Sequence, residues 1–136
     1  MLTLVAILVL GLAYLGFENF RKSSIDMARD AMKEEIASMT REALNYYKRP
    51  RHLGGGGNSF LQFNEVRRKR IRPKSRKEPT GKIIWETQTA VYRVVIAAKD
   101  SVVIDGVGDN IGNDGSTPIK VRGIIKPNEL YFLTLN

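Results

Sequence analysis

The sequence has no cysteine and only one histidine, His52, in its 136 residues. Disulfides, thiolate catalysis and cysteine-ligated zinc are therefore excluded, and an extracellular form of the chain would need another source of stability. General acid–base and nucleophilic catalysis require a base fixed near its partner, and a histidine between Pro50 and a run of glycines is poorly held. No spacing of His, Asp or Glu typical of a metal site is present. We therefore predict a protein that is not an enzyme, with no metal, no cofactor and no small-molecule substrate.

Charge is absent from the first seventeen residues, MLTLVAILVLGLAYLGF. As a helix this run would be ~26 Å long at about 1.5 Å per residue, near the lower limit for crossing a bilayer. A cleavable secretory signal needs a positively charged start and a small-residue cleavage site, and the run instead begins apolar and passes directly into Glu18. We expect this segment to lie in lipid or in protein, and a permanent single-pass anchor is one interpretation.

Neither proline nor glycine interrupts residues 25–47, and apolar side chains recur there at spacings of three and four. This pattern is typical of a helix with one apolar stripe. We therefore predict one helix over about residues 2–48, ~70 Å long, apolar on every side in its first third and amphipathic afterwards. The predicted stripe consists of Ile25, Ala28, Met32, Ile36, Met39, Ala43 and the pair Tyr46/Tyr47.

Short segments rich in β-branched and aromatic residues follow the helix and predict strands. We expect strands at residues 59–63, 82–87, 89–97, 101–104, 119–125 and 130–135. A helix followed by strands predicts an α+β fold, with a small antiparallel sheet whose apolar face lies on the helical stripe. The expected units are a hydrophobic helix half (1–24), an amphipathic half (25–49), a corner (50–58) and a β domain (59–136).

The stretch RPRHLGGGGNSF, residues 49–60, could be a phosphate loop, a free linker or a structural corner. A Walker-type loop needs a lysine and Ser/Thr after its last glycine, whereas Asn58 and Ser59 follow here. A free linker is disfavoured because the stripe before it needs the sheet after it. Proline disfavours helix at the preceding residue, and glycines permit positive φ or close backbone approach. The predicted corner is formed by Pro50, Gly54, Gly55, Gly56 and Gly57.

A strongly basic run contributes to the formal net charge of +8. Such a run is usually a solvated loop or hairpin. The alternative is a patch that binds DNA or another polyanion by releasing its counterions. The residues of this candidate patch are Arg67, Arg68, Lys69, Arg70, Arg72, Lys74, Arg76 and Lys77.

Residues 105–115, DGVGDNIGNDG, combine possible calcium ligands with turn-forming residues. No register supplies the alternating oxygens, central glycine and final glutamate of an EF-hand. Glycine, asparagine and aspartate are also the commonest turn formers. We therefore predict a decorated loop here, with a weak calcium site of another type as the alternative.

The whole layout resembles a type IV pilin or pseudopilin in mature form. The resemblance is strongest over residues 1–60, in particular ALNYYKRPRHLGGGGNSF (43–60), and extends to VVIDGVGDNIGNDGSTPIKV (102–121). Two features depart from the family pattern. Val5 stands where most such pilins carry a glutamate that neutralises a neighbour's N-terminal amine, and no proline precedes Pro50. Registration of subunits in this chain therefore cannot use that glutamate.

The resemblance implies a structural subunit of an extracellular, type IV pilus-like filament: a homopolymer on the cell surface, inserted in the inner membrane before assembly. The alternatives are a minor pilin or pseudopilin that binds DNA or another anionic surface, and an anchored protein that never polymerises. Gly11 and Gly16 mark a segment that could unwind, because glycine costs a helix about 1 kcal/mol relative to alanine; close helix packing is the other interpretation. The expected polymerisation core comprises Leu4, Val5, Ile7, Leu8, Leu10, Leu12, Leu15 and Phe17.

Overall fold

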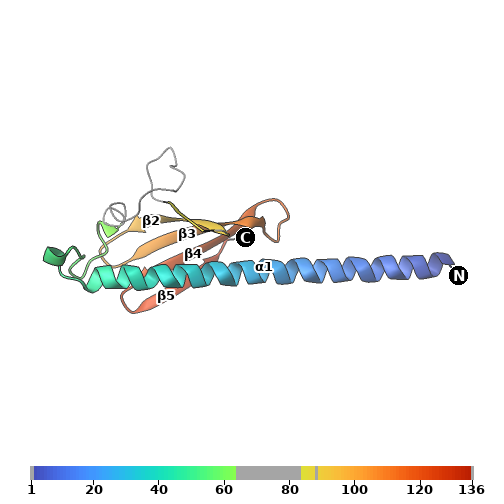
Figure 1. The fold of residues 1–136 in the computed structure, drawn as a ribbon, viewed down its shortest axis with the longest axis horizontal. Coiled ribbons are helices and arrows are strands. Elements are labelled where there is room, and N and C mark those ends of the chain that lie inside the picture. Colours follow the sequence, from blue (N-terminus) through green and yellow to red (C-terminus); the bar gives the residue numbers. More distant parts are fainter. Residues whose placement is uncertain (1, 64–83, 88, 136) are drawn as a thin grey trace.

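The computed structural model describes residues 2–63, 84–87 and 89–135 (Figure 1). One helix, α1 (Leu2–Lys48), is followed by a short 3-10 helix, η1 (Arg51–Leu53). The strands are β1 (Ile84–Glu86), β2 (Ala90–Ala97), β3 (Val102–Ile111), β4 (Pro118–Lys126) and β5 (Glu129–Thr134). They form one sheet in the order β1-β2-β3-β4-β5, with every neighbouring pair antiparallel. The predicted α+β fold is therefore confirmed, including the long N-terminal helix.

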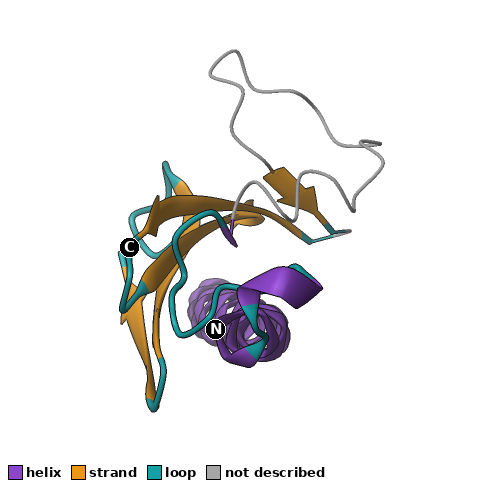
Figure 2. Ribbon diagram, turned by 90° about the vertical axis from the view of Figure 1, so that its left-hand side faces the viewer, coloured by secondary structure: helices purple, strands orange, loops and turns teal. Residues whose placement is uncertain are grey.

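The sheet lies along the C-terminal half of α1, while the N-terminal half projects beyond it without cover (Figure 1). Viewed along the helix axis, the strands curve around one side of α1 (Figure 2). The helix packs mainly on β3 and β4, the strands near the middle of the sheet. One half of a single continuous helix is thus part of a folded domain, and the other half is not.

The amphipathic stripe forms one side of the core, as the periodicity predicted. Met32 and Ile36 are almost completely buried, and Ala28 and Tyr47 pack at the edge of the core. Alternate residues of the strands face the stripe, which is the pattern of a sheet with one buried face. These inward residues are Ala90, Tyr92 and Val94 of β2, Val102 and Ile104 of β3, and Ile119, Val121 and Ile125 of β4.

The prediction of a decorated loop over residues 105–115 is wrong for most of its length, because β3 continues to Ile111. The glycines in this segment make room for the helix. A Cβ atom at Gly106 would lie 2.6 Å from the Tyr92 ring and 3.1 Å from Met32 Cε, and one at Gly108 would lie 3.1 Å from Met32 Sδ. On β4, a Cβ at Gly123 would lie 2.5 Å from Ile36 Cγ2. Inward glycines in adjacent strands therefore let α1 approach the sheet closely.

The predicted strand at residues 59–63 is also wrong. Asn58 and Gln62 have positive φ values of 59° and 68°, so the chain turns here and cannot remain extended. The turn carries Phe60 and Phe63 into the core, where they contact Tyr47 and Tyr46 with ring centroids 4.6 and 5.5 Å apart. The aromatic pattern that suggested a strand instead packs the turn against the end of α1.

Glu35 connects the helix to the turn between β1 and β2. Its carboxylate accepts hydrogen bonds from the hydroxyls of Tyr92, of Thr87 at 3.1 Å and of Thr89 at 3.3 Å. Burial raises the pKa of Tyr92 above its usual value, and the bond to Glu35 raises it further, so this side chain stays a neutral donor. Glu35 therefore fixes the helix against the sheet edge through polar contacts as well as apolar packing.

Candidate assembly surface

The N-terminal half of α1 presents apolar side chains on all sides. Every described residue from Leu2 to Phe17 is exposed, and Ile25 is the first buried side chain along the helix. The eight residues predicted as a polymerisation core are each between 60% and 71% exposed: Leu4, Val5, Ile7, Leu8, Leu10, Leu12, Leu15 and Phe17. Water-exposed apolar area on this scale is unfavourable by roughly 25 cal/mol per Å², so this half needs an apolar partner outside the subunit.

Length and composition make α1 a candidate membrane span, and its most apolar eighteen-residue window is not buried in the subunit at all. A signal sequence at an N-terminus can meet the same criterion of length and composition. The described chain therefore has a long apolar N-terminal helix with the physical properties of an anchor or a signal.

Ion pairs begin where the apolar half ends. Arg21 Nη2 lies 3.1 Å from Glu18 Oε1, and both side chains remain partly exposed. Further along the helix, Arg29 pairs with Asp26 at 3.3 Å and Lys33 with Asp30 at 3.7 Å, each three residues apart. Pairs of this kind, three residues apart on a helix and with at least one exposed partner, contribute only a few tenths of a kcal/mol. Because charged residues begin at Glu18, the uniformly apolar surface is limited to the residues before it.

Gly11 and Gly16 do not interrupt the helix, which is continuous from Leu2 to Lys48. A Cβ atom at either position would meet nothing within 4 Å. Unwinding at these glycines is therefore absent from the single chain. Unwinding after assembly, and close packing of a second helix against them, both stay predictions.

The oligo-glycine corner terminates α1 by satisfying its last carbonyl groups. The amide of Gly56 donates to Tyr46 O at 2.7 Å, that of Asn58 to Tyr47 O at 2.8 Å, and that of Gly57 to Arg49 O at 2.9 Å. The last carbonyls of a helix have no partner within the helix and need such donors. The corner is therefore a C-terminal cap in which the chain folds back over the helix end.

The four glycines meet different steric demands in this cap. Gly54 and Gly57 have φ values of 79° and 57°, in the left-handed region. Gly55 and Gly56 have no room for a side chain, because a Cβ would lie 2.1 Å from Arg49 O and 1.8 Å from Ser59 O, respectively. The corner has the location that was predicted, and it leads into the turn at Phe60 instead of into a strand.

Two candidate sites remain: the basic run and the segment considered for calcium. The basic residues Arg67 to Lys77 lie outside the described residues. In the segment considered for calcium, Asp105 makes a bidentate pair with Arg122 at 2.6 and 2.8 Å, and Asp114 accepts hydrogen bonds from Thr117. Within the described ranges, no group of three or more His, Cys, Asp or Glu side chains is arranged to hold a metal ion. Two of the carboxylates that suggested calcium, those of Asp105 and Asp114, are engaged in other contacts.

No family model, curated protein or solved structure matches this chain. The sequence analysis did not single out Glu35. Its spacing of three residues from Met32 and four from Met39 is the signal that places it beside the buried face.

Proposed function

We propose that this protein is the structural subunit of a type IV pilus-like extracellular filament. The observation that supports the proposal best is the contrast in burial along α1: the chain before Glu18 is apolar and exposed on every side, whereas the apolar stripe that begins at Ile25 is covered by the chain's own sheet. Identical copies could bury the exposed halves against one another in a filament core. The sheet domains would then form the outer layer.

Assembly supplies a large driving force for such a segment. Full burial of a Leu, Ile, Val or Phe side chain contributes about 1.5–3 kcal/mol relative to exposure. Eight such side chains are among the candidate core residues, and the loss of translational and rotational freedom opposes only part of this sum. Before assembly, a bilayer would provide the same apolar surroundings, which accounts for a membrane-inserted precursor state.

The second candidate is an anchored protein that never polymerises, and the length of the apolar helix supports it equally. Binding of DNA or another polyanion through residues 67–77 remains a prediction from sequence. Extraction with detergent distinguishes a helix held in lipid from a helix held in a protein polymer. An anchored monomer disperses on extraction, whereas a filament sediments.

The proposal is tested by extraction, sedimentation and negative-stain electron microscopy of the wild-type chain and two variants. Leu8→Lys places a charge inside the proposed filament core, and we expect it to abolish fibres. Leu53→Lys is the matched control, because Leu53 is exposed to a similar extent, at 62% against 63%, but lies in η1 at the other end of the helix. Dispersed wild-type monomers, or equal loss of fibres in both variants, would contradict the proposal.

A further inference from the structure

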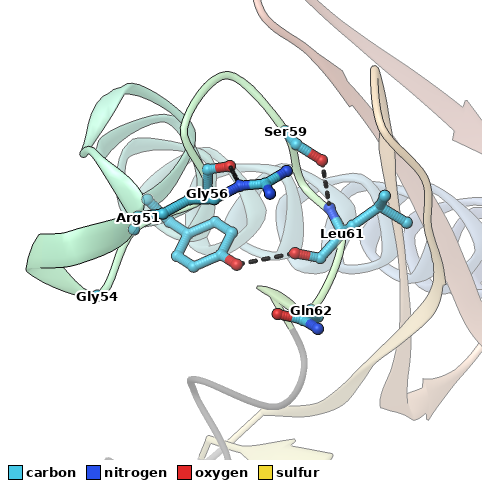
Figure 3. A pocket seen from close by; sticks show the side chains of 8 residues that line it. Arg51, Gly54, Gly56, Ser59, Leu61 and Gln62 are labelled. Carbon is cyan, nitrogen blue, oxygen red and sulfur yellow. Dashed lines mark hydrogen bonds between the residues drawn. The ribbon is translucent and has the colours of Figure 1, made fainter.

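A cavity of about 310 Å³ opens beside the oligo-glycine corner (Figure 3). It lies between the end of α1 with η1 on one side and the turn of residues 59–62 on the other. Its polar and aromatic lining comes from Tyr46, Arg51, Ser59 and Gln62, with the backbone of Gly54–Gly56 between them. Pockets that bind small ligands begin at about this size.

Arg51 is the charged side chain among the described residues that line the cavity, and none of these lining residues is acidic. Arg51 uses Nε for a long contact of 3.5 Å with Gly56 O, which leaves its two Nη groups available. In the described ranges, no carboxylate lies within ion-pair distance of this guanidinium. A planar anion could therefore bind its free edge without displacing an existing ion pair.

The surrounding groups are held in place by the fold. The Tyr46 hydroxyl donates to Leu61 O at 2.8 Å, and the Leu61 amide donates to Ser59 Oγ at 3.1 Å. These bonds fix the turn across the cavity from Arg51, as Figure 3 shows. The Gln62 carboxamide makes no hydrogen bond with the described residues, and Gln62 lines the same cavity (Figure 3). A charged donor and a neutral amide thus border one cavity.

We propose that this cavity binds the carboxylate of an acidic sugar, such as a uronic acid residue in a polysaccharide. The Arg51 guanidinium matches a carboxylate in shape and charge. The exposed Gln62 carboxamide provides a donor and an acceptor suited to sugar hydroxyls. Base stacking does not fit this cavity, because Tyr46 is only 8% exposed and stacking needs an open aromatic face.

The cavity lies at the opposite end of α1 from the exposed apolar half (Figure 1). It is therefore separated, by the length of the helix, from the surface that protein, lipid or a detergent micelle would cover. The binding proposal is independent of polymerisation, since it involves only residues within one subunit.

Binding is tested on the full chain in detergent micelles at constant ionic strength, by calorimetry or ligand-observed NMR. Galacturonic acid is the probe, and galactose is the neutral control of the same size. We expect saturable binding of galacturonic acid alone. Arg51→Gln should weaken it roughly tenfold or more, because a charge-assisted hydrogen bond is lost. Arg51→Lys should also weaken it, because lysine lacks the planar fork.

Two further variants separate a local site from general charge. Lys48→Gln removes one positive charge from the same corner without touching the cavity lining, so affinity should stay within about twofold of wild type. Gln62→Glu keeps the side-chain shape but repels a carboxylate, and it leaves the hydrogen bonds of the corner intact. Equal binding of galactose, equal losses in Lys48→Gln and Arg51→Gln, or unchanged binding in Gln62→Glu would each overturn the proposal. Equally tight binding of sulfate would overturn the assignment to a sugar.

Discussion

The two halves of α1 belong to one continuous helix and are both rich in apolar residues, yet only one of them has a partner within the subunit. In the C-terminal half, apolar side chains form one stripe, and this stripe packs on the inner face of the sheet, mainly on β3 and β4. In the N-terminal half they occupy all sides, and a single sheet cannot cover a cylinder. The distribution of apolar residues around the helix, more than their number, thus decides which half folds alone and which half needs other molecules.

Two glycines of the exposed half and two of the folded domain show the same difference in surroundings. Gly11 and Gly16 face open space, whereas Gly56 and Gly123 have neighbouring atoms where a side chain would stand. A glycine in the exposed half is therefore available for contact with another chain. At Gly56 and Gly123, by contrast, other parts of the fold already occupy that space.

The largest difference between the halves should come from truncation of a large side chain. Ile36→Ala should lower the free energy of unfolding by about 2–5 kcal/mol, because it leaves a cavity between α1 and β4. Leu8→Ala should change it by less than about 0.5 kcal/mol, because Leu8 is exposed in the subunit. Urea unfolding of monomers in mild detergent, followed by fluorescence of the single tryptophan, measures both. Similar losses in the two variants would contradict the division of the helix.

Replacement of glycine by alanine should have opposite effects in the two regions. Gly56→Ala places a methyl group against Ser59 O and should destabilise the subunit by about 1–3 kcal/mol or more, as overpacking does. Gly11→Ala should instead favour the helix by about 1 kcal/mol, since the added methyl group meets nothing. The same unfolding measurement serves for the first variant and helical circular dichroism for the second. A neutral result for Gly56→Ala would show that the corner can relax.

A smaller effect is expected from the polar connection between α1 and the sheet. Glu35→Ala removes the acceptor for the buried Tyr92 hydroxyl and should cost about 1–3 kcal/mol. The adjacent residue provides the control, because Glu34 is exposed and has no described partner in the sheet. Thermal unfolding of Glu35→Ala and Glu34→Ala should therefore differ. Equal melting temperatures would mean that apolar packing alone positions the helix.

The smallest effect should be an acid response of the turn between β3 and β4. Hydrogen bonds from Thr117, first from its hydroxyl and then from its amide, lower the pKa of Asp114 from 3.8 to about 2, with a further contribution from the Ser116 amide. A depressed pKa stabilises the fold above the unfolded value, so this contribution is present above pH 3.8 and is lost as the pH falls to about 2. Amide hydrogen exchange at Thr117 should accelerate over that range, and Asp114→Ala should remove the dependence. Unchanged exchange in wild type would contradict this account.

Periodic features of the sequence predicted the structure well. The three- and four-residue spacing from Ile25 to Tyr46 specified the buried face. The content of β-branched residues located β1, β2, β4 and β5 to within a few residues. The failures have physical causes. Gly106 and Gly108 were interpreted as turn residues because the sequence does not show that Met32 lies opposite them. Residues 59–63 have strand-like composition, but the positive φ of Gln62 depends on tertiary contacts.

The candidate sites also differ in how much of them the sequence alone could predict. The exposed apolar half was predictable because a run without charge needs no knowledge of the fold. The position of the corner was predictable from Pro50 and its glycines. Its role as a cap, with amides reaching back to Tyr46 and Tyr47, was not, because those contacts exist only once the chain has turned.

The most direct test of the central claim measures whether the N-terminal halves of different subunits lie side by side. Because the chain has no cysteine, Leu8→Cys and Leu53→Cys each allow a single spin label to be attached. In detergent-free material, the label at residue 8 should show strong dipolar coupling between subunits that disappears on dilution with unlabelled chain, and the label at residue 53 should show much weaker coupling. Absence of coupling at residue 8 would contradict the filament and leave the N-terminal half as a solitary anchor in lipid.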